Sequence, residues 1–103
     1  MQFTAYQNAD TATRKRVPYL LSVQSDLIGE MNSCVVVPLI APERAEVAAS
    51  RLMPTLHVDG KPWVMDTLLL AGIPRRALGK PVADLSSERA AIMAALDLLI
   101  SGI

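Results

Sequence analysis

Apolar and polar residues alternate over two short stretches near the start of the chain. Residues 3–7 follow the pattern of a half-buried β-strand, and residues 17–23 resume it after the polar residues 8–16. Pro18 lies near the start of the second stretch, where the loss of a backbone donor is tolerated. The pattern therefore predicts two antiparallel strands joined by a polar hairpin loop whose tip is mobile.

The next part of the chain has the pattern of a turn followed by a central strand. Residues 29–32 begin with glycine and end with asparagine, as expected of a turn. Residues 34–37 are apolar on successive positions, which is typical of a strand covered on both faces, and Pro38 predicts a bend or a bulge after them. Residues 42–50 are rich in Ala and Glu but short, so we expect a loop with at most two helical turns.

Asp59-Gly60 is the clearest hairpin signal in the sequence. It lies between the β-rich residues 56–58 and 63–65, and an Asp-Gly pair suits a tight turn because both residues tolerate positive φ. Residues 70–78 contain apolar positions interrupted by glycine and proline. They predict one last strand or turn before the C-terminal segment.

The period of the pattern changes at the end of the chain. Apolar residues now recur three or four positions apart, as on one face of an α-helix, at Ile92, Leu96, Leu99 and Ile103. Asp84 or Ser86 is suited to cap the start of this helix, and Gly102 is suited to end it. About five short antiparallel strands and one C-terminal α-helix predict a mainly β fold, either an SH3-like barrel or a strongly bent antiparallel sheet.

Composition narrows the class of protein. A chain of 103 residues is expected to form a single domain, residues 1–103, with an aliphatic core because only 4% of the residues are aromatic. With 51% hydrophobic residues, the surface is expected to keep apolar area for a dimer interface or a partner. Ten basic and ten acidic side chains cancel, so no general positive field favours direct binding of nucleic acid.

Few side chains are candidates for chemistry. The single Cys34 and the single His57 lack the spacing of a zinc site, and we expect no metal, no cofactor and no catalytic residue. Cys34 is interpreted as a core residue, His57 as a strand histidine and Trp63 as a packing residue. The start of the chain lacks the pattern of a signal peptide, and no stretch is long enough to span a bilayer. We therefore expect a cytoplasmic protein.

Six ordered stretches of the chain resemble the CcdB family of toxins. They cover residues 1–6, the Gln-Ser-Asp stretch at 23–28, residues 36–39, 54–58 and 82–86, and the final Gly102-Ile103. The resemblance implies a CcdB-like fold and a homodimer whose two C-terminal helices lie close to the two-fold axis. It also implies that the protein acts by binding and is not an enzyme.

The partners implied by the resemblance are DNA gyrase and an antitoxin. Toxins of this family bind the gyrase A subunit and trap the enzyme on cleaved DNA. A CcdA-like antitoxin removes them through a disordered C-terminal segment, and the basic residues Arg14, Lys15 and Arg16 are a suitable place for an acidic segment to dock. Carried over by motif position, the gyrase-binding residues would be Leu27, Ile28, Asp97, Ile100, Ser101, Gly102 and Ile103.

The C-terminal motif departs from the family at one position. CcdB toxins carry a tryptophan directly before the final Gly-Ile, where this chain has Ser101. Since tryptophan is a common interface hot spot, one alternative is an interaction protein that keeps the fold but no longer poisons gyrase. Another alternative is an endoribonuclease toxin of similar fold. Arg75 and Arg76 would then bind phosphate instead of lying on a solvated surface.

Overall fold

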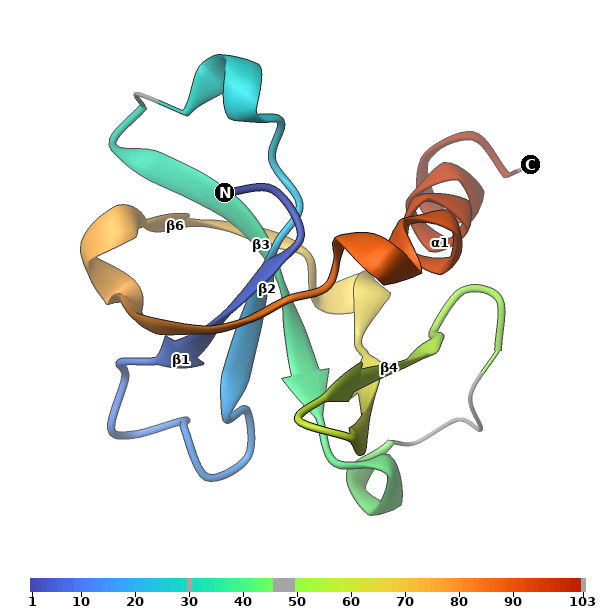
Figure 1. The fold of residues 1–103 in the computed structure, drawn as a ribbon, viewed down its shortest axis with the longest axis horizontal. Coiled ribbons are helices and arrows are strands. Elements are labelled where there is room, and N and C mark those ends of the chain that lie inside the picture. Colours follow the sequence, from blue (N-terminus) through green and yellow to red (C-terminus); the bar gives the residue numbers. More distant parts are fainter. Residues whose placement is uncertain (30, 46–49, 103) are drawn as a thin grey trace.

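A strongly curled antiparallel sheet followed by a C-terminal helix makes up the computed structural model, which describes residues 1–29, 31–45 and 50–102 (Figure 1). The strands are β1 (Thr4–Asn8), β2 (Tyr19–Ser22), β3 (Ser33–Ile40), β4 (Thr55–Val58), β5 (Lys61–Met65), β6 (Ala71–Pro74) and β7 (Leu78–Asp84). Short 3-10 turns connect several of them: η1 (Asp26–Ile28), η2 (Pro42–Arg44), η3 (Thr67–Leu69), η4 (Arg75–Ala77) and η5 (Ser86–Glu88). The helix is α1 (Arg89–Ser101). The prediction of a mainly β fold with one C-terminal helix is confirmed, although the described residues form seven strands.

β3 is the central strand, and its two ends pair with different neighbours. On one edge it pairs with β2. On the other edge, residues 33–36 pair with β6, whereas residues 39–40 pair with β5. The strand order is β4-β5-β3-β2-β1-β7, with β6 beside β3. Because β5 and β6 leave the same edge of β3 at different points, the twisted sheet curls into a half-barrel.

Pro38 lies inside β3 without interrupting its pairing with β2, so the bulge offered by the prediction is wrong. The pairing of β3 with β2 runs in register across this residue, from Leu39 opposite Tyr19 to Val36 opposite Ser22. The Pro38 carbonyl accepts a hydrogen bond from the Asp66 amide at 2.9 Å, on the side away from β2. Since the amide of a strand residue points the same way as its carbonyl, the missing donor falls between β5 and β6 and weakens no pairing with β2.

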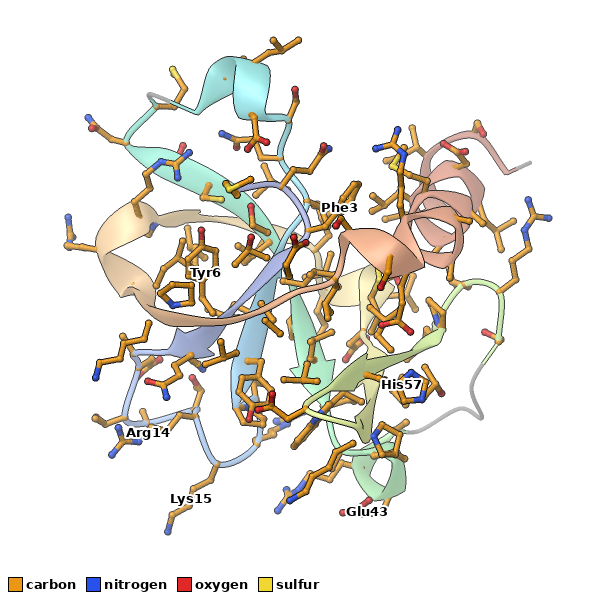
Figure 2. All side chains as sticks on the ribbon, in the orientation of Figure 1. Phe3, Tyr6, Arg14, Lys15, Glu43 and His57 are labelled. Carbon is orange, nitrogen blue, oxygen red and sulfur yellow. The ribbon has the colours of Figure 1, made fainter. Side chains whose placement is uncertain are left out.

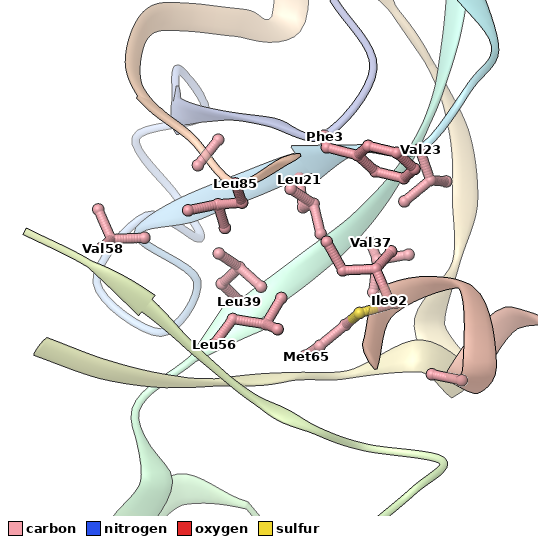
Figure 3. Close-up of a cluster of buried hydrophobic side chains, with 12 residues drawn as sticks. Phe3, Leu21, Val23, Val37, Leu39, Leu56, Val58, Met65, Leu85 and Ile92 are labelled. Carbon is pink, nitrogen blue, oxygen red and sulfur yellow. The ribbon is translucent and has the colours of Figure 1, made fainter. Parts of the chain in front are cut away.

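The main hydrophobic core fills the curl of the sheet and is closed by α1. Ile92 and Ala95 are 0% exposed, so one face of the helix packs against the strands. Leu96 and Leu99 are only half-buried, and Ile103 lies outside the described residues. Figure 3 shows the side chains that meet in this core: Phe3, Leu21, Val23, Val37, Leu39, Leu56, Val58, Met65, Leu85 and Ile92.

One predicted hairpin turn and the predicted end of the helix are confirmed. Asp59 and Gly60 join β4 to β5 with φ angles of 53° and 77°. Gly102 ends α1 with a φ of 75°, and its amide donates to the Leu98 carbonyl at 3.1 Å. Both turns need left-handed backbone, which glycine adopts without steric cost and aspartate tolerates.

The start of the helix differs from the prediction. Asp84 Oδ1 accepts a hydrogen bond from the Ser86 amide at 2.9 Å, just before η5, and α1 itself begins only at Arg89. The residue before α1 is Glu88, so neither Asp84 nor Ser86 caps the helix. The backbone and side-chain hydrogen bonds from Ser86 hold the pKa of Asp84 below its ordinary value, because they stabilise the carboxylate. The turn η5 thus separates Asp84 from the first residue of the helix.

The remaining loop predictions are only partly met. Residues 70–78, expected to form one strand or turn, contain β6, η4 and the first residue of β7. In residues 42–50 the structure forms the single turn η2, and residues 46–49 of this loop lie outside the described part, as does Glu30 of the predicted turn at 29–32.

Candidate functional site

The turn η1 holds large apolar side chains in solvent. Leu27 is 96% exposed and Ile28 is 54% exposed, and Met31 just after the turn is also exposed. We call Leu27, Ile28 and Met31 the apolar loop. The Gln2 amide donates to Asp26 Oδ1 at 2.8 Å, which ties the start of the chain to η1. Polar contacts therefore fix the backbone of the turn, while its leucine and isoleucine stay available to a partner.

The end of α1 forms a second surface. The predicted site residues described there are exposed. Ile100 is 79% exposed, and Asp97, Ser101 and Gly102 are exposed as well. We call these four residues the helix tail. Ser101 Oγ donates to the Asp97 carbonyl at 2.7 Å, so the hydroxyl is bonded within its own helix. The predicted Ile103 lies outside the described residues.

The apolar loop and the helix tail are not in contact within one copy of the chain. Figure 1 shows η1 at the top of the molecule, above the N-terminus, and the end of α1 well apart from it at the right. The structure therefore brings Leu27 and Ile28 together on one turn, and Asp97, Ile100 and Ser101 together on another. It does not join the two groups.

The basic residues Arg14, Lys15 and Arg16 are all exposed on the loop between β1 and β2. We call them the basic run. Figure 2 shows Arg14 and Lys15 pointing away from the sheet into solvent. Their positive charges are thus presented together at one end of the β1–β2 hairpin, as the interaction with an acidic segment requires.

Hydrogen bonds within the β1–β2 loop shape the backbone that carries the basic run. The side chain of Asn8 is buried, and its Nδ2 donates to Thr13 Oγ1 at 3.0 Å and to the Val17 carbonyl at 2.9 Å. Asp10 Oδ2 accepts from Thr13 Oγ1 at 3.1 Å. The loop predicted to have a mobile tip is therefore closed on itself by side chains that the sequence analysis did not single out.

His57 and Glu88 connect the β4–β5 hairpin to the start of α1. Glu88 Oε2 accepts from the His57 amide at 2.9 Å, and Glu88 Oε1 lies 3.0 Å from His57 Nδ1. The histidine side chain is more than half exposed, which suits the interpretation of a strand histidine. We call this pair the clasp. It joins segments that are 31 positions apart in the sequence, so no local pattern pointed to it.

Replacing Glu88 by alanine is expected to lower the free energy of unfolding by about 1 kcal/mol, because both clasp hydrogen bonds are lost at a partly exposed site. His57→Ala should cost less, since the bond to the backbone amide survives. Urea unfolding followed by Trp63 fluorescence measures both losses. The control is Glu43→Ala, which removes an exposed carboxylate on η2. Equal losses for Glu88→Ala and Glu43→Ala would contradict a stabilising clasp.

Cys34 and Trp63 have structural surroundings. Cys34 is buried, and its Sγ lies 3.3 Å from Ser22 Oγ, which confirms its interpretation as a core residue. The Trp63 ring meets the Tyr19 ring edge-on, with centroids 5.1 Å apart, as expected of a packing residue. Neither side chain is as exposed as those of the apolar loop.

Arg75 is engaged with the protein's own backbone. Its Nε donates to the Met31 carbonyl at 2.6 Å, and its amide donates to the Asn32 carbonyl at 2.9 Å. These bonds hold η4 against the loop before β3. The Arg75 guanidinium therefore has a structural contact, whereas Arg76 beside it is exposed. Within the described part of the chain, α1 with its 13 residues is too short to cross a membrane.

The comparison with known families agrees with this architecture. A family model described as CcdB protein matches residues 2–102, so it spans β1, the apolar loop, the basic run and α1. The match covers nearly all of the 103 residues, and the curled sheet with one C-terminal helix is consistent with a CcdB-like fold. The chain therefore belongs to the CcdB family and has the fold of a toxin from a toxin–antitoxin system.

Proposed function

We propose that this chain is the toxin of a type II toxin–antitoxin module and that it binds the A subunit of DNA gyrase, trapping the gyrase–DNA cleavage complex. The observation that carries the proposal is the exposure of Leu27 and Ile100, at 96% and 79%, on residues that match the family's gyrase-binding motifs. Apolar side chains held in solvent on ordered turns are typical of protein-binding surfaces. The protein acts in the cytoplasm as a ligand of one gyrase state and performs no catalysis.

A homodimer is part of this proposal. Leu96, Leu98 and Leu99 are only half-buried on α1, and they offer apolar area that a second copy would cover. A two-fold dimer of this chain presents two copies of the helix tail. The gyrase subunit is also a two-fold dimer, so each contact would be made twice.

The cognate antitoxin is the other proposed partner. An acidic, disordered segment would be attracted to the basic run, since opposite charge raises association rates. Figure 1 supports a separate surface for this contact, because the β1–β2 loop and η1 lie at opposite edges of the molecule.

A second candidate function follows from Ser101. Its small hydroxyl is bonded to the Asp97 carbonyl, so it supplies no apolar contact where CcdB toxins carry tryptophan. The candidate is a homodimeric interaction protein that keeps its antitoxin but does not bind gyrase.

Calorimetric titration with purified gyrase A subunit tests the proposal. Replacing Ile100 by aspartate is expected to weaken binding at least about tenfold, because a charge would enter an apolar contact. The matched control is Ala90→Asp, which adds the same charge at an exposed position at the other end of α1. Removing residues 101–103 provides an independent test of the helix tail.

The outcomes separate the two candidates. Binding by the unmodified chain and by Ala90→Asp, with a loss in Ile100→Asp, supports the gyrase proposal. Undiminished binding by Ile100→Asp and by the truncated chain contradicts a role for the helix tail. If the unmodified chain does not bind the gyrase subunit, the second candidate replaces the first.

A further inference from the structure

Hydrogen bonds hold the apolar loop in place, because its side chains bury little surface. Leu27 is 96% exposed, and none of the residues of η1 is buried. At the front of the loop, the Leu27 amide donates to Ser25 Oγ at 3.2 Å. Gln24 Nε2 donates to the Ile28 carbonyl at 3.0 Å. A segment with so few packed side chains depends on such bonds for its order.

The far end of the loop is held by Arg75, whose side chain reaches a residue 44 positions away in the sequence. Ser33 and Pro74 are paired where β3 begins and β6 ends, so Arg75 lies beside the residues that lead into β3 (Figure 1). The Arg75 amide donates to the Asn32 carbonyl at 2.9 Å. Its Nε donates to the Met31 carbonyl at 2.6 Å. The pairing of β3 with β6 is thus continued beyond the sheet, first by the backbone of Arg75 and then by its side chain.

The chemistry of the Arg75 side chain suits this contact. A guanidinium stays protonated in proteins, and a hydrogen bond from a charged donor is stronger than one between neutral groups. Arg75 is half-buried, whereas the adjacent Arg76 is exposed. The two arginines therefore differ in their surroundings, and the bond to the loop belongs to Arg75.

Met31, whose carbonyl accepts this bond, is the last residue of the apolar loop. Its side chain is 59% exposed. Fixing the carbonyl limits the rotation of the backbone that carries this side chain, so the loop is held at both ends. A partner that binds an ordered loop loses less conformational entropy, and its apparent affinity is higher.

We infer that Arg75 is a positioning residue for partner binding: its bond to the Met31 carbonyl keeps the apolar loop in the conformation that the partner recognises. The inference rests on the proposed function, in which this partner is gyrase. Arg75 lies outside the six stretches from which the gyrase-binding residues were predicted, and it acts through the loop.

Two substitutions of Arg75 separate its hydrogen bond from its charge. Glutamine carries an N–H donor at the same number of bonds from Cα as arginine Nε, but it is neutral. Methionine has a carbon at that place and cannot donate. Arg75→Met therefore removes the bond and the charge, whereas Arg75→Gln removes the charge alone. Arg76→Met is the matched control, since it removes the same charge from the exposed neighbour on η4.

Backbone order parameters from NMR relaxation test the inference on the loop itself. In the unmodified chain the Met31 and Asn32 amides should have order parameters of about 0.85, as in rigid backbone. Arg75→Met is expected to lower them below about 0.6, the range of flexible backbone. Arg75→Gln and Arg76→Met should keep them unchanged. The methyl resonances of Ile92 should not shift in any of the three variants, which verifies that the core is intact.

Calorimetric titration with the gyrase A subunit measures the consequence for binding. Arg75→Met should weaken binding about three- to tenfold, because apparent affinity falls with the fraction of molecules whose loop is in the binding conformation. Arg75→Gln and Arg76→Met should both stay within about twofold of the unmodified chain, since a lost surface charge has a small effect.

The outcomes distinguish positioning from direct contact. Unchanged order parameters in Arg75→Met, or equal effects of Arg75→Met and Arg76→Met, would overturn the inference. A loss of gyrase binding in Arg75→Gln with an ordered loop would also overturn it, because the guanidinium would then contact gyrase itself. If the unmodified chain does not bind the gyrase subunit, the proposed function fails. In that case a loop that loosens in Arg75→Met alone still supports Arg75 as its positioning residue, and an unchanged loop overturns this role.

Discussion

Replacing Ile92 by alanine is expected to lower the free energy of unfolding by about 2–5 kcal/mol, the range for emptying a fully buried aliphatic site. Ile92 is 0% exposed and is the larger of the two fully buried helix residues in the main core (Figure 3). The loss combines the transfer of the missing carbons with the cavity that the rigid half-barrel leaves. Urea unfolding monitored by Trp63 fluorescence measures it at one fixed protein concentration, since a dimer's stability depends on concentration.

Ile100→Ala is the control for this variant. It makes the same change on the same helix, but Ile100 is 79% exposed, so the free energy of unfolding should change by less than about 0.5 kcal/mol. A loss below about 1 kcal/mol for Ile92→Ala would mean that α1 is not packed on the sheet as described. A large loss for Ile100→Ala would mean that the helix tail is buried, for instance in a dimer.

Gly79→Ala is the second substitution with a large expected effect, and it should lower the free energy of unfolding by about 1–3 kcal/mol. An added Cβ at this position would lie 2.8 Å from the Gln7 carbonyl oxygen and 3.0 Å from Gln7 Cβ. The obstacle includes backbone of the neighbouring strand β1, so no side-chain rotation relieves the contact. The register of β1 and β7 is irregular here, between Tyr6 and Asn8, which lets the two backbones approach closely.

Gly72→Ala provides the comparison within the same sheet. Nothing lies within 4 Å of a Cβ added to Gly72 in β6. The free energy of unfolding of the Gly72→Ala variant should therefore stay within about 0.5 kcal/mol of that of the unmodified chain. Thermal unfolding of the two variants side by side measures the difference. If the two substitutions have equal effects, the close approach of β7 to β1 is not as the structure describes.

Local sequence signals predicted the parts of the fold that depend on local chemistry. Asp59-Gly60 identified its hairpin because two consecutive positive φ angles restrict the choice of residues. Gly102 identified the helix end for the same kind of reason. The valines of β3 marked a central strand, since a strand with neighbours on both edges and cover on both faces needs such residues.

Non-local pairing explains the elements that the sequence did not predict. β7 contains Gly79, Lys80 and Pro81, which disfavour a strand, and yet it pairs with β1 over most of its length. Pro81 is tolerated because β7 is the outer strand of the sheet and its pairing is irregular there. β6 is similarly short and rich in breakers, and its pairing with β3 makes it a strand.

The candidate sites also differ in whether neighbouring positions in the sequence or the fold brings their residues together. The apolar loop and the helix tail are short stretches of sequence, so motif position was enough to name most of their residues. The basic run was named from its three consecutive positive charges. The bond between Arg75 and Met31 joins segments 44 positions apart in the sequence, and only the fold places them together. The clasp between His57 and Glu88 escaped prediction for the same reason.

The clasp protects the β4 edge of the sheet from pairing with another chain. β4 is the outer strand at one end of the sheet, and its exposed backbone donors are a template on which another chain could add a strand. Glu88 Oε2 occupies one of these donors, the His57 amide. An incoming strand would have to displace a charged acceptor and would meet the carboxylate in its path, so fibrous edge-to-edge growth is disfavoured at this border.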